Sequence, residues 1–231
     1  HGAINGATWY ENTYGCTDSY ADNHNPDANW DDGSCTYPDN GDYSLSFDGV
    51  DDYIVSNTDY NLPFGNSDRT LMASINLKSF VTDAAILQYG TPSDNNLCAI
   101  GISPTIGKWF FWSYDNDLTS IGNLDANDWV NLAVTISNDG SLVGMYVDGI
   151  LDNLATLNSP INTIFSSSIQ FGKSFQDKYF DGNIDDISIW NISFDSTQIQ
   201  SYMSTPPTGN EENLVGYWKF NAGTGDTLYD H

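Results

Sequence analysis

Positive charge is scarce in this sequence of 231 residues, since six Lys and Arg stand against 31 Asp and Glu, for a formal net charge of −25. Six positive charges cannot build a basic groove, so we expect neither nucleic acid nor an anionic membrane surface as a partner. The chain also lacks a run of 18 apolar residues, so we expect no insertion into a membrane. It starts at His1 without a signal-peptide pattern, and we interpret it as a processed or excised fragment.

Glutamate is scarce too, because 28 of the 31 acidic residues are Asp. Asp, together with the abundant Asn, disfavours helix interiors and favours turns, caps and cages of oxygen ligands around cations. Aromatic residues make up 14% of the chain, which is too many for a disordered protein. The composition therefore predicts an extracellular all-β protein that tolerates, or requires, divalent cations.

From residue 42 onward, apolar and polar residues alternate with a period of two, which is typical of half-buried antiparallel strands. A short helix is predicted near residues 195–203, capped by Asp195. Many short strands and one short helix predict a sandwich of two antiparallel sheets. Asp-Gly pairs, which supply the positive φ of tight hairpins, occur at residues 48–49, 139–140, 148–149 and 181–182. The clearest strands are residues 43–47, 71–77, 130–136, 142–147 and 185–190.

The sequence has only three cysteines, in two different settings. Cys16 and Cys35 are 19 residues apart in a polar region, and we expect them to form a disulfide. Cys98 stands alone in an apolar run, and we expect it to be a buried thiol. One bridge and one core thiol suit an oxidising compartment, so we expect a secreted protein of the extracellular cell surface.

Four segments resemble, in order, the strands of one known domain family. Residues 43–54 are similar to the opening hairpin of the laminin-G-like, concanavalin A-like jelly rolls in surface proteins of Bacteroidetes-type bacteria. Residues 129–135, 145–150 and 180–190 resemble later strands of that family. The resemblance implies an all-β jelly roll of two antiparallel sheets, usually in secreted modules that bind glycans, mediate adhesion or accompany enzymes.

The resemblance also implies how the chain is divided. Residues 1–10 and 42–203 would form the jelly roll, and residues 204–212 would form a linker. Residues 11–41 would be an inserted segment that is rich in Asp and Asn and bounded by the disulfide. The last strand, residues 213–221, resembles the first strand of such a domain. It would complete the sheet of its own chain, or that of a neighbouring copy through strand exchange.

The inserted segment resembles a Cys-bounded repeat of secreted Bacteroidetes-type proteins and the Asp-rich calcium loops of thrombospondin type 3 repeats. Calcium takes six to eight oxygen ligands from carboxylates, amides and carbonyls, and this segment offers many of them. The alternative is a solvated loop of Asx turns held by the disulfide. The predicted Ca²⁺ ligands of this segment are Asp18, Asn23, Asn25, Asp31 and Asp32.

A second Ca²⁺ site is predicted at a sheet edge, where folds of this kind often hold a structural calcium. Asp48, Asp51 and Asp52 flank the first hairpin, and Asp185 and Asp186 begin a strand that is expected nearby. The predicted ligands of this site are Asp48, Asp51 and Asp186. The alternative is that Asp48 only forms a turn and that the other carboxylates are simply exposed.

Residues 108–114 form the densest aromatic stretch of the chain. As a strand it sends Trp109 and Phe111 to one face, and Phe110, Trp112 and Tyr114 to the other. One set must be core, and the other could bind sugar by stacking. The alternative is that both sets are covered. The predicted ligand-binding residues, including two from the polar loop at residues 173–179, are Trp112, Tyr114, Phe175 and Tyr179.

Catalysis is not expected. Glycosidases of the fold that this chain resembles share a Glu-x-Asp-x-x-Glu strand, which is missing here. Arg69 is the only Arg, which excludes the Arg cluster of a sialidase-like site. Two of the three His are terminal residues, so a catalytic His is not expected either.

We therefore expect a secreted, calcium-stabilised and non-enzymatic laminin-G-like module. It would act in cell-surface adhesion or as a tandem repeat of an extracellular filament or array. Its partner would be a glycan or a cell-surface protein. The alternative is a carbohydrate-binding module appended to a polysaccharide-degrading enzyme.

Overall fold

The computed structural model describes residues 11–17, 21–36, 42–56, 61–80, 83–103, 105, 107–164, 168–223 and 228. The chain divides into a small unit, residues 1–41 with 221–224, and a large unit, residues 42–220 with 225–231. The small unit contains the parallel strands β1 (Tyr14–Gly15) and β2 (Trp30–Asp31). A disulfide joins Cys16 to Cys35, which confirms the predicted pairing.

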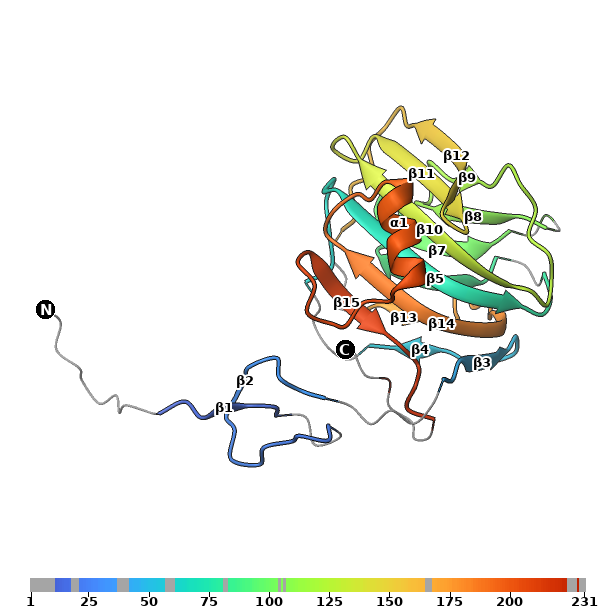
Figure 1. Ribbon diagram of the computed structural model, residues 1–231. Helices are drawn as coiled ribbons and strands as arrows, with labels where there is room; N and C mark the ends of the chain where they lie inside the picture. Colours follow the sequence, from blue (N-terminus) through green and yellow to red (C-terminus); the bar gives the residue numbers. More distant parts are fainter. Residues whose placement is uncertain are drawn as a thin grey trace, which may run out of the picture. The chain divides into compact units, whose positions relative to one another are not determined.

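The large unit is a sandwich of two antiparallel sheets (Figure 1), which confirms the predicted all-β fold. Within the described residues, one sheet has seven strands, and its order is β12-β11-β10-β5-β14-β15, with β3 also paired to β14. These strands are β3 (Leu45–Asp48), β5 (Arg69–Leu77), β10 (Trp129–Ser137), β11 (Leu142–Val147), β12 (Ile150–Thr156), β14 (Asp181–Trp190) and β15 (Leu214–Trp218).

The other sheet has six strands in the described part of the chain, and its order is β4-β13-β6-β7-β8-β9. They are short, and four of them have only two to four residues. The strands are β4 (Ile54–Val55), β6 (Ala85–Gly90), β7 (Leu97–Ile102), β8 (Trp109–Trp112), β9 (Leu118–Thr119) and β13 (Gln170–Phe171).

The main core lies between the two sheets and is built by the period-two pattern. In β5 and β10, Leu71 pairs with Val134 and Ala73 pairs with Leu132, and all four side chains are at most 2% exposed. Burial of a Val or Leu side chain stabilises the fold by about 1.5–3 kcal/mol relative to exposure. Alternate residues of the central strands therefore hold the two layers together.

Strand β14 has neighbours on both sides. It pairs with β5 along one edge, while β3 and β15 share its other edge. The register shifts between Asp185 and Ser188, where Asp186 takes a positive φ of 48°, so an irregularity separates the two halves of the strand. Strand β15 pairs with β14 within the chain, and strand exchange with a neighbouring copy stays a prediction.

The helix α1 (Ser196–Ser204) covers the outer face of the seven-stranded sheet (Figure 1). Asp195 caps it, since its side chain accepts the N–H of Gln198 while the Gln198 side chain accepts that of Asp195. Ile199 packs in a cluster with residues of that sheet, among them Met72 and Trp190. No other helix occurs in the described ranges, and none found there could cross a membrane.

The only Arg of the chain belongs to the core. Arg69 is fully buried, and its guanidinium donates to the carbonyls of Pro63 (2.9 Å) and Gly65 (2.7 Å) and to the hydroxyl of Thr163 (2.9 Å). It fixes the segment that leads into β5 against the loop that precedes β13. This guanidinium is therefore not available to a ligand at the surface.

Candidate functional site

The outer face of the six-stranded sheet carries the polar and aromatic residues that do not fit the core. Sheet register places Gln170, Gln88, Ala99 and Trp112 opposite one another across four strands. The next row contains Gly101, Phe110 and Thr119. A Cβ at Gly101 would lie 3.2 Å from the Phe110 ring and 2.7 Å from the Ala84 carbonyl oxygen. The small residues of β7 thus leave room for the large rings of β8.

The aromatic side chains of β8 divide between the two faces of the strand. Trp109 and Phe111 are fully buried in the core between the sheets, as the alternation predicts. On the other face, the ring centroids of Phe110 and Trp112 are 5.1 Å apart, and that of Phe175 lies 4.6 Å from Trp112. These outward rings form a separate cluster with Leu97 and Ala99 of β7.

The cluster is only partly open to a ligand. Phe110 and Trp112 are 7% and 8% exposed, because Phe175 lies against Trp112, whereas Tyr114 is 44% exposed. The Tyr114 ring lies tilted against that of Phe175, with 5.5 Å between ring centroids. A sugar cannot lie flat on Trp112 in this arrangement, so the accessible aromatic surface consists of Tyr114, Phe175 and the ring edges beside them.

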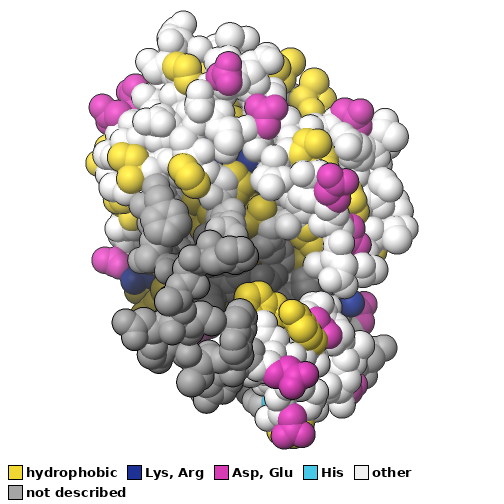
Figure 2. Space-filling view, turned by 90° about the vertical axis from the view of Figure 1, so that its left-hand side faces the viewer, with side chains coloured by type: hydrophobic (Ala, Val, Ile, Leu, Met, Phe, Trp, Pro, Cys, Tyr) yellow, Lys and Arg dark blue, Asp and Glu magenta, His cyan; other side chains and the backbone are white. Residues whose placement is uncertain are grey.

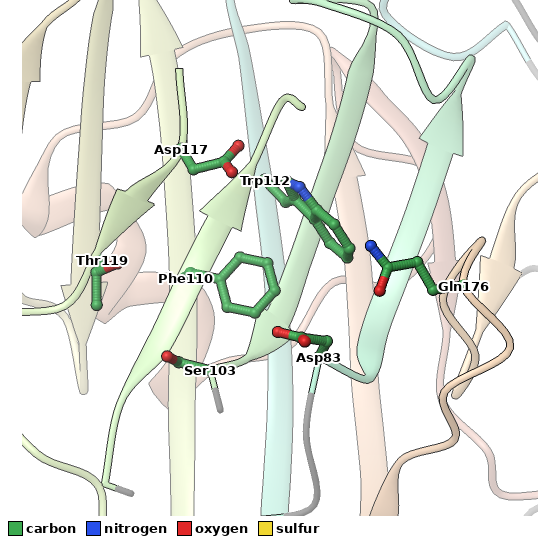
Figure 3. Close-up of a pocket in the computed structure, with 7 residues that line it drawn as sticks. All are labelled: Asp83, Ser103, Phe110, Trp112, Asp117, Thr119 and Gln176. Atoms are coloured by element: carbon green, nitrogen blue, oxygen red, sulfur yellow. The ribbon is translucent and has the colours of Figure 1, made fainter. Parts of the chain in front are cut away.

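A hollow of about 210 Å³ opens beside the cluster (Figure 3). The Phe110 and Trp112 rings point into it together with the Asp83 carboxylate and the Gln176 amide (Figure 3). Pockets for small molecules usually measure roughly 300–1,000 Å³, so this hollow suits a small group such as one ring of a larger ligand. Its lining consists of Asp83, Ser103, Phe110, Trp112, Asp117, Thr119 and Gln176.

Asp117 both shapes the hollow and lines it. Its Oδ1 accepts the N–H groups of Ser113 (3.0 Å) and Tyr114 (3.1 Å), which closes the turn between β8 and β9. Burial raises the pKa of this carboxyl above its ordinary value, although the two backbone hydrogen bonds oppose the shift. The turn that presents Tyr114 and the wall of the hollow are therefore built by the same side chain.

The loop at residues 173–179 rims the aromatic cluster. Gln88, which is buried in β6, accepts the N–H of Phe175 at 3.2 Å and donates to the Gln170 side chain at 2.7 Å. Lys173 and Tyr179 pair as an isolated antiparallel bridge at the base of the loop. Phe175 is thus anchored to the sheet through one buried amide.

Three of the four predicted ligand-binding residues come together in the structure: Trp112, Tyr114 and Phe175. The fourth, Tyr179, lies against Tyr53, with 6.3 Å between ring centroids, and beside the ammonium of Lys173. Sequence reasoning missed the polar lining. Only the position of Thr119 could have been found, as the partner of Phe110 across a short hairpin.

Three carboxylates gather at the turn after β3. Asp48, Asp51 and Asp52 are exposed, and one oxygen from each lies within 4.8 Å of the others. Ligands at about 2.4 Å from one Ca²⁺ can be up to roughly that far apart, so the spacing fits the ion. One Asp48 oxygen also accepts the Val50 N–H at 2.8 Å, as expected of a turn former.

Asp186, which we grouped with Asp48 and Asp51, lies elsewhere. In the sheet Asp48 pairs with Asp181, five positions before Asp186 on β14. The Asp186 carboxylate accepts a hydrogen bond from the Tyr217 hydroxyl instead. Asp52, rather than Asp186, therefore completes the cluster at the turn.

In the small unit, the candidate ligands make Asx turns and local hydrogen bonds. Asn25, Asp31 and Asp32 each accept a backbone N–H two residues ahead, at 3.0–3.1 Å. Asn23 accepts the N–H of Thr36 at 2.8 Å. Asp18 lies outside the described residues. In the part of the chain that the structure describes, no group of three acidic, His or Cys side chains other than the turn after β3 has ligand spacing.

Comparison with known proteins matches residues 47–200, more than half of the chain, to the family model of the concanavalin A-like lectin/glucanases superfamily. No curated protein matches the chain significantly in sequence.

Several solved structures share the fold. A protein from Bacteroides ovatus, named as a candidate carbohydrate-binding protein, is 18% identical with a TM-score of 0.65 over 84% of this chain, which spans 57% of that protein. Domain 4 of an extracellular arabinanase from Geobacillus stearothermophilus, solved with arabinotriose, is 14% identical with a TM-score of 0.54, covering 68% of this chain and 86% of that domain. A pentraxin from Limulus polyphemus is 10% identical with a TM-score of 0.57, covering 84% and 94%.

Proposed function

The chain belongs to the concanavalin A-like lectin/glucanases superfamily, and from that premise we propose that it is a carbohydrate-binding module. The observation that carries the proposal is the aromatic cluster beside a polar hollow on the outer face of the six-stranded sheet. Sugar rings present apolar C–H faces that pack on aromatic rings and hydroxyls that bond to carboxylates and amides. Tyr114 and Phe175 would supply the first contact, and Asp83, Asp117 and Gln176 the second.

The solved structures support the same reading. One similar protein is named for carbohydrate binding, and the arabinanase domain was solved with arabinotriose. At 18% and 14% identity the two proteins share the fold with this chain, and the name of the first and the arabinotriose of the second motivate the proposal.

A glycan array followed by calorimetry tests the proposal. Truncation of one stacking ring costs about 0.5–1.5 kcal/mol beyond its buried area, so Tyr114→Ala and Phe175→Ala should each weaken binding about 3- to 10-fold. Trp129→Ala is the control, because Trp129 is 49% exposed and belongs to the other sheet. If no glycan binds, or if both variants bind as the unchanged protein does, the proposal fails.

We also propose that the module acts without catalysis. The hollow contains two carboxylates, Asp83 and Asp117, but Asp117 is engaged by two backbone N–H groups in a turn. None of the three Glu lies in a strand of the sandwich. Chromatography of the bound oligosaccharide after long incubation should show no cleavage. Cleavage that disappears in Asp117→Asn would overturn this part of the proposal.

Calcium is proposed as the stabilising cofactor, held by Asp48, Asp51 and Asp52. An ion that binds only the folded protein adds about 2.7 kcal/mol to stability at 100 times its Kd. Chelation should therefore lower Tm, and Asp51→Asn with Asp52→Asn should remove that response, whereas Asp125→Asn at an exposed position should not. An equal Tm with chelator and with calcium would refute the site.

For the biological setting we propose a secreted cell-surface module, acting in adhesion or as a repeat of an extracellular filament. The alternative, a carbohydrate-binding module appended to a polysaccharide-degrading enzyme, is favoured by the likeness to the arabinanase domain. Since β15 pairs with β14 of the same chain, light scattering should find a monomer. Chains of subunits would instead indicate strand exchange between copies.

A further inference from the structure

We infer that the hollow beside Phe110 and Trp112 selects a neutral sugar and rejects anionic glycans such as uronates and sulfated sugars. The inference rests on the proposed function and deepens it by naming the class of ligand. It follows from the position of every positive charge in the chain and from the two carboxylates in the lining, Asp83 and Asp117.

None of the six Lys and Arg lines the hollow, and all six lie in the described residues. Arg69 is fully buried and donates to the core loops. Lys78 pairs with Asp181 at 3.4 Å. Lys219 directly follows β15 and lies near Asp185 and Asp186 of β14, in the seven-stranded sheet and not in the sheet that carries the hollow.

The three remaining lysines lie nearer to the hollow, and two of them are already engaged. Lys108 donates to the carbonyls of Ile121 and Gly122, at 2.5 and 3.0 Å. Lys173 pairs with Asp177 at 2.8 Å and lies over the Tyr53 ring. Lys178 is exposed on the rim loop. An anionic sugar in the hollow would therefore meet carboxylates without a lining cation to compensate its charge.

The lining matches the groups of an uncharged sugar. Carboxylates accept hydroxyl protons in charge-assisted hydrogen bonds, which are about twice as strong as neutral ones. The Gln176 amide and the hydroxyls of Ser103 and Thr119 can both donate and accept. The Phe110 and Trp112 rings face the same space (Figure 3), but they are only 7% and 8% exposed and add a small apolar surface beside these polar groups.

The negative net charge of the whole protein also disfavours anionic sugars, but it acts at longer range than the lining of the hollow. Figure 2 shows one face, on which Asp and Glu are spread widely and Lys and Arg are few. Salt at 0.15 M screens such exposed charges beyond about 8 Å, whereas a carboxylate that contacts the ligand is screened much less. Selectivity that comes from the hollow should therefore persist at high salt.

The test compares a neutral oligosaccharide with its uronate analogue of equal length and linkage, β-1,4-mannan against β-1,4-mannuronan fragments, by calorimetry in 0.15 and 0.5 M NaCl. Where another sugar proves to be the ligand in the array, its own uronate or sulfated analogue is used. At a few ångströms and protein-like screening, one added like charge should weaken binding at least tenfold.

Asp117→Asn and Asp83→Asn should each weaken neutral-sugar binding, because a charge-assisted hydrogen bond is lost, but should weaken uronate binding less or improve it. The discrimination should therefore fall at least threefold, whereas the exposed Asp125→Asn should leave it unchanged. Equal binding of both analogues, or discrimination that vanishes in 0.5 M NaCl and ignores both substitutions, would overturn the inference but leave carbohydrate binding standing. Failure to bind any glycan would instead refute the proposed function.

Discussion

Asp185 offers a sharp test of the energetics of β14. Its half-buried carboxyl lies at the irregularity of the strand, where Asp186 is the next residue. Burial, with the neighbouring charge of Asp186, raises its pKa to about 7, although the Asp186 N–H and Lys219 oppose the shift. In the unfolded chain the same carboxyl would have a pKa of about 3.9.

The sign of the effect follows from proton binding. Between about pH 4 and pH 7 the folded protein retains a proton on Asp185 that the unfolded chain has released, so stability falls as pH rises through this window. A difference of about 3 pKa units corresponds to at most about 4 kcal/mol. Because the carboxyl is partly exposed, solvent screening reduces this contribution, and we expect the free energy of unfolding to change by about 1–2 kcal/mol.

Asp185→Asn tests the reasoning. In the unchanged protein the Asp185 carboxylate accepts the Asp186 N–H at 2.8 Å, and the amide oxygen of Asn can still accept it. Urea unfolding with chelator present, followed by tryptophan fluorescence, should show the variant about 1–2 kcal/mol more stable than the unchanged protein at pH 8 and equal to it at pH 4. Asp125→Asn, which removes the same charge at an exposed position, corrects for general repulsion. An Asp185→Asn effect that is independent of pH would refute the argument.

Two further predictions concern buried groups. Arg69→Ala should destabilise the protein by about 3 kcal/mol or more in urea unfolding, because the Pro63 and Gly65 carbonyls lose a buried donor; a loss below about 1 kcal/mol would contradict this. Cys98 is fully buried, and burial raises the pKa of its thiol, so a thiol reagent should label it only after unfolding; rapid labelling of the folded protein would be the contrary result.

The regular parts of the fold could be predicted because their determinants are local. Alternation of apolar residues fixes which face of β5 and β10 points into the core between the sheets. The capping residue Asp195 fixes the start of α1 at Ser196, one residue from the predicted position. The division of Trp109 and Phe111 from Trp112 follows from the same period of two. These features need no knowledge of what lies next to the strand.

The candidate site was less predictable because it depends on register and on loops. The register between β14 and β3 puts Asp181 beside Asp48, so Asp186, five residues further along β14, lies away from the carboxylates of the turn. Coverage of Trp112 depends on a loop some 60 residues later, fixed through Phe175 and Gln88. No period in the sequence encodes either contact.

Charged and aromatic side chains have different roles in the core and on the outer face of the six-stranded sheet. The only guanidinium lies in the core, where Arg69 binds backbone carbonyls. The lysines near the outer face are engaged by carbonyls or by Asp177, with the exception of the exposed Lys178. On β8, one face of the strand holds the sandwich together while the other presents rings beside Asp83 and Asp117. The same strand therefore supports the fold and leaves an acidic, partly aromatic hollow, whose composition suits uncharged ligands that offer many hydroxyl donors.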